Sequence, residues 1–304
     1  MKVSIIGAGN VGSALAERVL AHNLADVVLV DIAGNLARAK ALDISDAAPL
    51  MGYKKTITGT NNYQETSGSS VVVITAGFPR QPGMSRDALI KKNRIIVSAV
   101  TRSLKEFTPG AILIVVTNPL DVMTYLAYKE TACQRQRILG MAGNLDTARF
   151  KVLLAQETGA PPEKIETFVM GSHGDTMVPL LSRTRVEGKP LEEILKPETI
   201  EKIVESTKMR GGEIVGFLKS GSAYFSPSAA CLEILRSLIL DEKKVIPCSA
   251  ILNGEYGVTD CAIGVPAKIG KDGIEEILEW ELPNEELSAL RKSAKAVRDI
   301  LNKL

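Results

Sequence analysis

This chain of 304 residues has few aromatic residues and almost no excess of one charge. Phe, Trp and Tyr make up only 4% of it, too few for the stacking platforms of proteins that bind single-stranded nucleic acid. Lys and Arg number 37 against 35 Asp and Glu, a net charge of +2. Because a polyanion is held by a basic field that this balance does not supply, we expect no nucleic-acid partner.

Long apolar runs are missing as well. The longest, residues 70–76 and 111–116, fall far short of the ~20 residues that span a bilayer. The first residues, MKVSIIGAGNVG, have a short hydrophobic run broken at once by glycine, where a signal peptide needs roughly 7–15 apolar residues. We therefore expect a soluble, cytoplasmic protein with no membrane partner.

Cysteine and histidine patterns point to neither disulfides nor metal. The four cysteines are Cys133, Cys231, Cys248 and Cys261. They form no C-x-x-C pair, and an intracellular chain of this size needs no disulfide staples. The two histidines, His22 and His173, are too few for an H-E-x-x-H helix or a His-rich site. We expect free, mostly buried thiols and no bound metal.

The length predicts about two domains, and the texture of the sequence changes near residue 143. Before that point, β-branched runs alternate with helical patterns, which is typical of a parallel sheet covered by helices. There we expect strands at Val3–Ile6, Val27–Val30, Val71–Thr75 and Ile112–Val116, and helices at Val11–His22, Asn35–Ala47 and from Arg86 to about Phe107. The first unit, residues 1–143, is therefore predicted to be a doubly wound α/β domain.

Residues 144–304 are predicted to form a mixed α/β substrate domain. We expect helices at Asp146–Glu157, Glu198–Lys219 and Pro227–Leu240, with a final helix capped by Asn284. Strands are expected near Thr167–Met170, Val178–Val186, Val245–Leu252, Ala262–Ile269 and Ile277–Leu282, with turns at Glu187–Pro190 and Lys271–Gly273.

A glycine-rich turn joins the first predicted strand to the first predicted helix. It runs Gly7-Ala8-Gly9-Asn10-Val11-Gly12, a G-x-G-x-x-G pattern. In this pattern Gly7 makes the tight turn, Gly9 lets the backbone approach a pyrophosphate, and Gly12 lets the helix pack on the sheet. The phosphates then lie at a helix N-terminus, which favours negative charge. The turn predicts a dinucleotide site on a Rossmann-type sheet.

An acidic residue completes this pattern. Asp31 follows about twenty residues later, at the end of the second predicted strand. Its carboxylate can accept both ribose hydroxyls and repels a 2′-phosphate, so we expect NAD rather than NADP. The alternative is a plain glycine-rich turn with an ordinary aspartate. A dinucleotide site also supplies no chemistry by itself, so a methyltransferase, a flavoprotein or a non-catalytic NAD sensor stays open at this point.

Histidine is the natural base for hydride transfer from an alcohol, because it titrates near neutral pH. His22 lies near the end of a predicted helix, where a solvated or C-capping role is expected. His173 lies in GSHGD, just after a predicted strand, and its flanking glycines let a ligand approach closely. His173 is therefore the candidate base, and a structural histidine in a tight turn is the alternative.

Two charged residues at helical spacing can serve that histidine. Asp146 and Arg149 are separated by i, i+3 and share one helix face. Asp146 can orient and stabilise an imidazolium, and Arg149 can bind a carboxylate bidentately. The alternatives are a helix cap and a surface ion pair.

Two further segments follow buried strands. The loop from Gly77 to Arg86 carries Arg80 and Arg86, so it is a candidate lid over an anionic substrate, with a solvated polar loop as the alternative. The segment Val116-Thr117-Asn118-Pro119 ends a predicted strand, and strand C-termini are where doubly wound sheets place their ligands.

Five segments together resemble the lactate/malate dehydrogenase family over essentially the whole chain. They are GAGNVG, AGFPRQPGMSRDAL, TNPLDV, GNLDTARF and GSHGDTMVP. Within the family the sequence is most similar to the lactate-dehydrogenase-like malate dehydrogenases. The resemblance implies a dinucleotide domain followed by a substrate domain, in a homotetramer or homodimer. One departure is Asn144, where the family more often has a small or aliphatic residue.

The resemblance also implies roles for individual residues. His173 is the expected proton donor and acceptor, Asp146 its orienting partner, and Arg149 the clamp on the substrate's C1 carboxylate. From the lid, Arg86 is expected to polarise the carbonyl. Asn118 is expected to bind the reacting oxygen and to hold the nicotinamide side of the pocket. Asn93 and the backbone of Val116 and Thr117 are expected to contact NAD.

Arg80 separates the two activities of the family, since lactate dehydrogenases usually have glutamine at the matching lid position. Its guanidinium suits the second carboxylate of a dicarboxylate and would be left unpaired over the methyl of pyruvate. The segment Gly221–Pro227 also resembles the malate version, with Ser222 and Ala223 as small residues. The resemblance thus implies reversible NAD-dependent oxidation of (S)-malate to oxaloacetate. The alternatives are the same chemistry on pyruvate or another 2-oxo acid, and a silent NAD-binding regulator.

Overall fold

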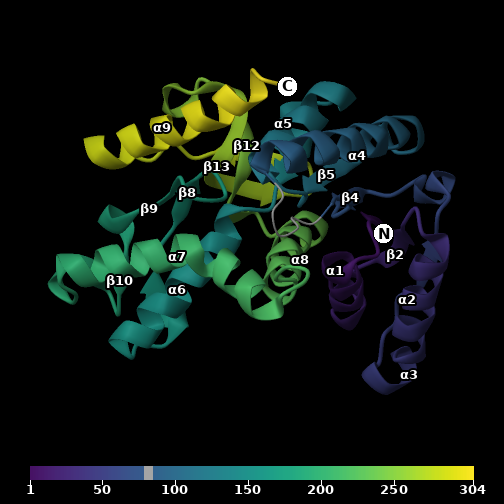
Figure 1. Ribbon diagram of the computed structural model, residues 1–304. Helices are drawn as coiled ribbons and strands as arrows, with labels where there is room; N and C mark the ends of the chain where they lie inside the picture. The colour runs from purple at the N-terminus through teal and green to yellow at the C-terminus, as the bar shows by residue number, and fades with distance from the viewer. Residues whose placement is uncertain (79–84) are drawn as a thin grey trace.

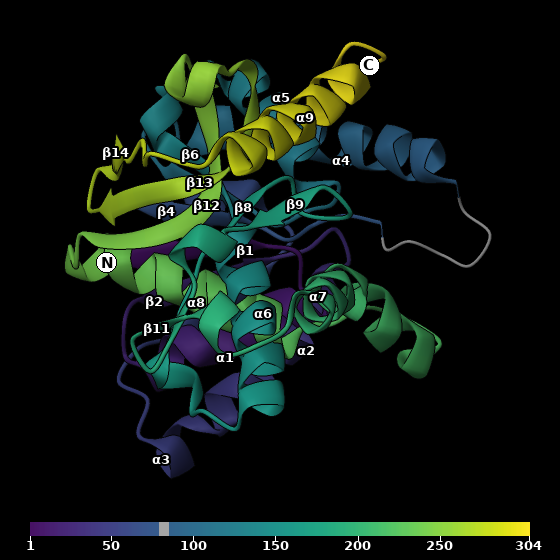
Figure 2. The same cartoon turned by 90° about the vertical axis from the view of Figure 1, so that its left-hand side faces the viewer.

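A computed structural model describes residues 1–78 and 85–304 of the chain. Eleven of its strands form one sheet, and three more form a small second sheet. Helices cover both faces of the large sheet, as Figures 1 and 2 show. In both views α4, α5 and α9 lie on one side of the sheet, and α1, α2 and α8 lie on the other. The molecule is therefore a helix–sheet–helix sandwich.

The first half builds the parallel part of the sheet. Its strands are β1 (Lys2–Ile6), β2 (Asp26–Val30), β3 (Ile57–Thr60), β4 (Val71–Ile74), β5 (Ile112–Val115) and β6 (Ile138–Gly140). Its helices are α1 (Asn10–Ala21), α2 (Gly34–Asp46), α3 (Ala48–Met51), α4 (Arg86–Phe107) and α5 (Leu120–Thr131). The strands are parallel in the order β3-β2-β1-β4-β5-β6, which confirms the doubly wound prediction. The order reverses between β1 and β4, and ligands bind at such a switch point.

The second half extends the same sheet with antiparallel strands. Its strands are β7 (Ile165–Glu166), β8 (Val169–Gly171), β9 (Met177–Pro179), β10 (Arg185–Val186), β11 (Lys189–Pro190), β12 (Lys244–Asn253), β13 (Thr259–Gly270) and β14 (Gly273–Ile277). Its helices are α6 (Gly143–Thr158), α7 (Pro197–Leu218), α8 (Phe225–Leu240) and α9 (Asn284–Leu301). β12 pairs with β6, and the sheet continues through β13 and β8 to β9. A single sheet therefore connects the glycine-rich turn to the segment that carries His173.

Most elements lie within a few residues of their predicted positions, but three predictions were wrong. The strand expected at Ile277–Leu282 is instead β14, because the turn after β13 leads straight into a return strand at Gly273. The N-cap of α9 is Pro283, and Asn284 is already inside the helix. Lys189 and Pro190 belong to β11 rather than to the turn before it. The short strands β3 and β6 and the helix α5 were not predicted at all.

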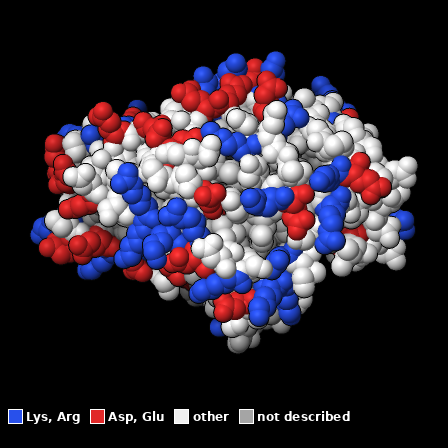
Figure 3. Space-filling view, turned by 90° about the horizontal axis from the view of Figure 1, so that it is seen from above, with Lys and Arg blue, Asp and Glu red and all other residues white. Residues whose placement is uncertain are grey.

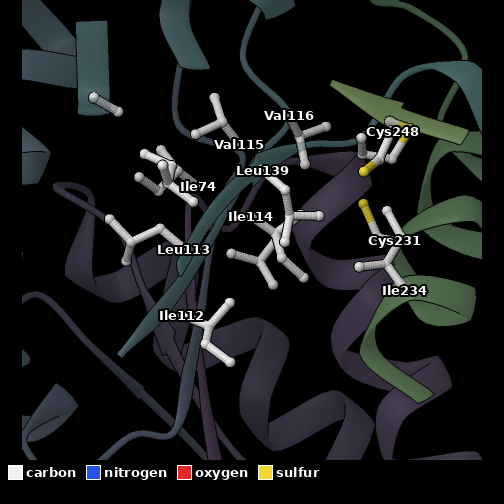
Figure 4. Close-up of a cluster of buried hydrophobic side chains, with 14 of the residues drawn as sticks. Ile74, Ile112, Leu113, Ile114, Val115, Val116, Leu139, Cys231, Ile234 and Cys248 are labelled. Atoms are coloured by element: carbon white, nitrogen blue, oxygen red, sulfur yellow. The ribbon is translucent and has the colours of Figure 1, made fainter. Parts of the chain in front are cut away.

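The core lies on both faces of the sheet, against α8 on one face and α4 on the other. Figure 4 shows Ile114 of β5 and Leu139 of β6 on the side of Cys231 and Ile234 of α8, while Ile74 of β4 and Leu113 of β5 lie on the other side. These strands are apolar at every position, VVVI in β4 and ILIV in β5, because both of their faces are buried. As expected, three of the four cysteines are buried and Cys133 is partly buried. Burial raises the pKa of the Cys248 thiol to about 12, so this thiol is not activated for chemistry.

The surface carries both signs of charge. Figure 3 shows acidic and basic side chains interspersed over one face of the molecule, in keeping with the net charge of +2. Among the helices of the described ranges, none is both long enough and apolar enough to span a bilayer.

We expect the core to show in mutant stability. Ile114 of β5 is fully buried, so Ile114→Ala removes apolar burial and leaves a cavity, which costs about 2–5 kcal/mol. Ile95 of α4 is 70% exposed, and Ile95→Ala is the matched control, expected to change stability by less than about 0.5 kcal/mol. Urea unfolding of both variants measures the difference. Equal midpoints for the two variants would contradict the assignment of β5 to the core.

Candidate active site

The glycine-rich turn has the geometry of a phosphate-binding turn. Gly7 has φ +113°, and a Cβ on Gly12 would come within 1.9 Å of the Gly7 carbonyl oxygen. Both positions therefore require glycine. Around Gly9, by contrast, no atom of the described residues lies within 4 Å of where a Cβ would be. Gly9 is also the N-cap of α1, so a ligand reaching it meets the free N–H groups of a helix N-terminus.

Asp31 follows β2 and faces this turn. Its carboxylate accepts hydrogen bonds from the Ala8 N–H at 2.7 Å and the Ala33 N–H at 2.9 Å. The first bond places Asp31 directly beside the glycine-rich segment, at the carboxyl edge of the sheet. Residues that the dinucleotide pattern linked only by spacing are thus in contact, and an open turn beside a carboxylate fits NAD.

The segment after β5 lies next to the same edge. Thr117 Oγ1 donates to the Ala76 carbonyl at 2.7 Å. Asn93 of α4 is buried, and its side chain donates to the Asn118 carbonyl at 2.6 Å and accepts from the Phe78 N–H, also at 2.6 Å. Asn93 therefore holds two loops at strand ends together. The Asn118 side chain is exposed and faces solvent.

The candidate base and its partners come together from distant parts of the chain. His173 Nδ1 lies 2.8 Å from Asp146 Oδ2, and Arg149 lies 3.6 Å from the other carboxylate oxygen. Asp146 and Arg149 belong to the first two turns of α6, as the i, i+3 spacing predicted. The Asp146 side chain is 2% exposed, against 16% for His173 and 12% for Arg149. The pair is thus shielded at the aspartate and open at the imidazole.

Two forces oppose each other on the imidazole. Burial disfavours the imidazolium, but the charge of Asp146 and its hydrogen bond favour it and prevail, so the pKa of His173 lies above its ordinary value of 6.5. Burial also disfavours the charged guanidinium of Arg149 and lowers its pKa. Within residues 1–78 and 85–304, Arg149 Nε is buried without a hydrogen-bond partner. A buried guanidinium in this state is suited to bind an anion.

Sequence reasoning missed the residues that hold the His173 loop. Asp121 of α5 accepts from the His173 N–H at 2.8 Å and from the Ser172 hydroxyl at 2.8 Å. From the other side, Ser293 of α9 accepts from the Ser172 N–H at 2.9 Å. The only local signal was the presence of Asp121 in the TNPLDV segment, which was singled out for Asn118 alone.

The structure also explains the unusual Asn144. Its amide donates to the Ala230 carbonyl of α8 at 2.9 Å and to Glu233 at 3.2 Å, and its oxygen accepts from the Leu145 N–H. Asn144 therefore ties the start of α6, which carries Asp146, to α8. An aliphatic side chain makes no such bond.

Of the two arginines in the candidate lid, only Arg86 belongs to the described residues. Arg80 lies outside the described residues. Arg86 is the first residue of α4, and its backbone position follows Ser85, whose hydroxyl caps the helix by accepting from the Ala88 N–H at 3.1 Å. His22, the histidine set aside, lies exposed at the C-cap of α1, as expected.

A dinucleotide turn at the carboxyl edge of parallel strands, together with a histidine held by a buried aspartate, is typical of NAD-dependent dehydrogenases. Two family models match the chain: lactate/malate dehydrogenase, NAD binding domain, over residues 1–140, and lactate/malate dehydrogenase, alpha/beta C-terminal domain, over residues 143–304. The chain belongs to the lactate/malate dehydrogenase family.

Relatives match along their full length. The chain is 48% identical to a malate dehydrogenase of Trichormus variabilis, covering 98% of this chain and 92% of that one. It is 44% identical to the malate dehydrogenase of Chloroherpeton thalassium, covering 100% and 98%. Among solved structures, the malate dehydrogenase of Salinibacter ruber superposes with a TM-score of 0.94 at 44% identity over 99% of this chain and 97% of that one.

The fold alone does not separate the two activities. A lactate dehydrogenase from Cryptosporidium parvum, solved with lactic acid and nicotinamide adenine dinucleotide, superposes with a TM-score of 0.96 at 39% identity, over 99% of this chain and 97% of that one. Its overlap with this chain is as complete as that of the malate dehydrogenases.

Asp31 gives a test of the cofactor. Its carboxylate would meet the 2′-phosphate of NADP at short range, so we expect at least a ~10-fold preference for NADH in kcat/KM, or ~1.4 kcal/mol. Asp31→Ser is expected to weaken NADH and improve NADPH. The control is Asp43→Ser, at an exposed position on α2, which should change neither. Equal rates with both cofactors in the unmodified protein would remove Asp31 from the site.

Proposed function

We propose that the protein catalyses the reversible NAD-dependent oxidation of (S)-malate to oxaloacetate. The observation that carries this proposal is the buried Asp146–His173 contact, with Arg149 one helical turn away. The oxidation of a 2-hydroxy acid requires a base for the hydroxyl proton and a cation for the neighbouring carboxylate. His173 and Arg149 offer both, side by side.

Proton transfer falls to His173. In the oxidative direction the neutral imidazole takes the hydroxyl proton of the substrate at Nε2, while Nδ1–H donates to Asp146 Oδ2 at 2.8 Å. The Asp146 carboxylate then stabilises the imidazolium. When bound, NAD supplies the acceptor for the hydride that leaves the carbinol carbon. In the reverse direction, protonated His173 returns its proton to the carbonyl oxygen.

Arg149 is proposed to bind the carboxylate at C1 of the substrate. Its side chain is 12% exposed and has an unpartnered Nε among the described residues, so an incoming carboxylate satisfies donors that the protein leaves free. Such charge-assisted pairs are about twice as strong as neutral hydrogen bonds. Holding C1 in this way presents C2, with its hydroxyl, to His173.

The remaining substrate contacts are proposed from the sequence. Asn118 is proposed to bind the reacting oxygen, and its exposed side chain supports this role. Arg86 is proposed to polarise the carbonyl. Arg80 is proposed to pair with the second carboxylate, which distinguishes oxaloacetate from pyruvate. The 44–49% identity to curated malate dehydrogenases supports that choice.

For the cofactor, we propose the turn from Gly7 to Gly12, Asp31, and the backbone of Val116 and Thr117. Asn93 is also proposed to contact the cofactor, and its amide bonds the backbones of Asn118 and Phe78 beside the proposed site. The proposed division of labour is an NAD-binding domain over residues 1–143 and a substrate domain over 144–304.

We also propose a homo-oligomer, dimer or tetramer. Large apolar side chains are exposed along the end of α7 and the start of α8: Met209, Val215, Phe217, Leu218 and Phe225. Such patches are typical of protein–protein contacts. The cytoplasmic location stays a prediction from the sequence.

The pH profile tests the role of His173. Reduction of oxaloacetate requires imidazolium, so its kcat/KM should fall as the pH rises through the pKa of His173, which lies above 6.5. Oxidation of malate requires the neutral ring, so its kcat/KM should rise across the same pH window.

Substitutions at the pair give a second test. His173→Asn should lower kcat by ~10²–10⁴-fold with NADH binding little changed, and Asp146→Asn should also lower kcat. Near-normal turnover of His173→Asn would refute the mechanism.

Substrate choice should depend on Arg80. Arg80→Gln removes a charge-assisted pair with the second carboxylate, worth about 1.5–3 kcal/mol, so we expect a ~10–150-fold loss in kcat/KM for oxaloacetate. A measurable gain with pyruvate should accompany it, because a guanidinium no longer faces the methyl group. Arg80→Lys, which keeps the charge, should lose less. If Arg80→Gln keeps its kcat/KM for oxaloacetate within a factor of two, Arg80 is a solvated residue and the malate assignment loses its main support.

A further inference from the structure

A second buried carboxylate lies beneath the candidate base, and the proton transfer described above does not use it. Asp121, at the start of α5, is 2% exposed. One of its oxygens, Oδ2, accepts from the His173 N–H and from the Ser172 hydroxyl, each at 2.8 Å. The other, Oδ1, accepts from the Ser249 hydroxyl of β12 at 2.7 Å. The three donors come from two separate strands or loops and converge on one side chain.

We propose that Asp121 is ionised and acts as a positioning residue for His173, both by holding its backbone and by adding a second negative charge beneath its ring. It raises the proton affinity of the imidazole alongside Asp146. The acid/base residue thus lies above two buried carboxylates, one that contacts the ring and one that contacts the main chain. The proposal rests on the proposed function only in giving His173 its acid/base role.

The surroundings of Asp121 favour its charged form. An ionised carboxylate accepts hydrogen bonds and donates none, and each contact of Asp121 is with a group that can donate. The His173 N–H can only donate, and the hydroxyls of Ser172 and Ser249 can do so. Its place in the first turn of the twelve-residue helix α5 adds the favourable end of the helix dipole. Burial opposes the charge and raises the pKa of Asp121. Three hydrogen bonds and a neighbouring imidazolium act against that penalty.

The position of Asp121 also connects two parts of the site. It lies three residues after Asn118, whose loop is proposed to contact substrate and cofactor, and it bonds the loop that carries His173. On its far side that loop is fixed by Ser293 of α9. A shift at Asp121 would therefore move the base relative to Asn118.

Several other charged groups surround His173, and a test must separate them. Asp146 and Arg149 approach from α6. A cavity of about 330 Å³ beside His173 is also lined by Asp175 of the same loop, by Asp299 of α9 and by Lys303, which follows that helix. Asp175 is exposed to solvent, which screens its charge.

The two histidines of the chain make a direct titration possible. Protein labelled with ¹³C at histidine Cε1 gives two ring signals, and His22→Gln assigns them. Asp121→Asn keeps the shape and the contacts, since its amide oxygen accepts from Ser172 and His173 and its NH₂ donates to the Ser249 hydroxyl. We expect this variant to lower the pKa of His173 by about 0.5–1 unit in the free protein. The matched control, Asp175→Asn, should lower it by less than about 0.3 unit.

Turnover supplies a second measurement. With the pKa lowered, the fall of oxaloacetate reduction should begin at lower pH, so that reduction above the pKa is about 3–10-fold slower than in the unmodified protein. Because the titration needs no substrate, a failure of the malate assignment leaves it intact. An unchanged or higher pKa of His173 in Asp121→Asn, with the fold preserved, would overturn the proposal.

A second variant covers the case in which Asp121→Asn does not fold. Ser172→Ala with Ser249→Ala removes two of the three donors and leaves the carboxyl in place, so the buried group should take up a proton and lose its charge. The pKa of His173 should again fall. If the signal of His173 titrates as in the unmodified protein, Asp121 carries no charge that His173 senses, and the proposal is wrong.

Discussion

The contact between Asp146 and His173 is the interaction on which the rest of the site depends. A carboxylate with a side chain only 2% exposed is costly to bury unless it is paired. His173 supplies a hydrogen bond at 2.8 Å, and Arg149 lies 3.6 Å away. The same buried charge therefore has two effects. It favours the imidazolium form of His173, and it holds the Arg149 guanidinium beside the proposed substrate position.

A short series of contacts connects this pair to the glycine-rich turn. A Cβ on Gly7 would meet Thr75 and Ala76 after β4, and the Ala76 carbonyl accepts from Thr117 after β5. Asn118 follows, and Asp121 reaches from the next helix to the His173 loop. Each step lies at the carboxyl end of a strand. Contacts between strand ends and the start of α5 thus link the glycine-rich turn to the His173 loop without any long connecting segment.

Site residues could be predicted from the sequence where they lie close together along the chain. The turn from Gly7 to Gly12, the i, i+3 pair in α6 and the glycine-flanked His173 were all visible as short patterns. Asp121 was not, because its partners are 51 and 128 residues away. Such contacts are set by the order of strands in the sheet. The strand misplaced at Ile277–Leu282 has the same origin, since apolar character predicts strands but pairing with β13 decides where one lies.

Substrate choice follows a different logic from the rest of the site. His173, Asp146 and Arg149 are proposed to contact the part that malate and lactate share, a hydroxyl next to a carboxylate. Interactions with a shared group bind both substrates equally and so give no selectivity. This is consistent with TM-scores of 0.94 and 0.96 to a malate and a lactate dehydrogenase. Discrimination is expected where the substrates differ, at C3 and C4, and there we propose that the guanidinium of Arg80 changes the balance. It is attracted by a carboxylate and is left desolvated by a methyl group. One lid residue can therefore separate activities that the fold leaves together.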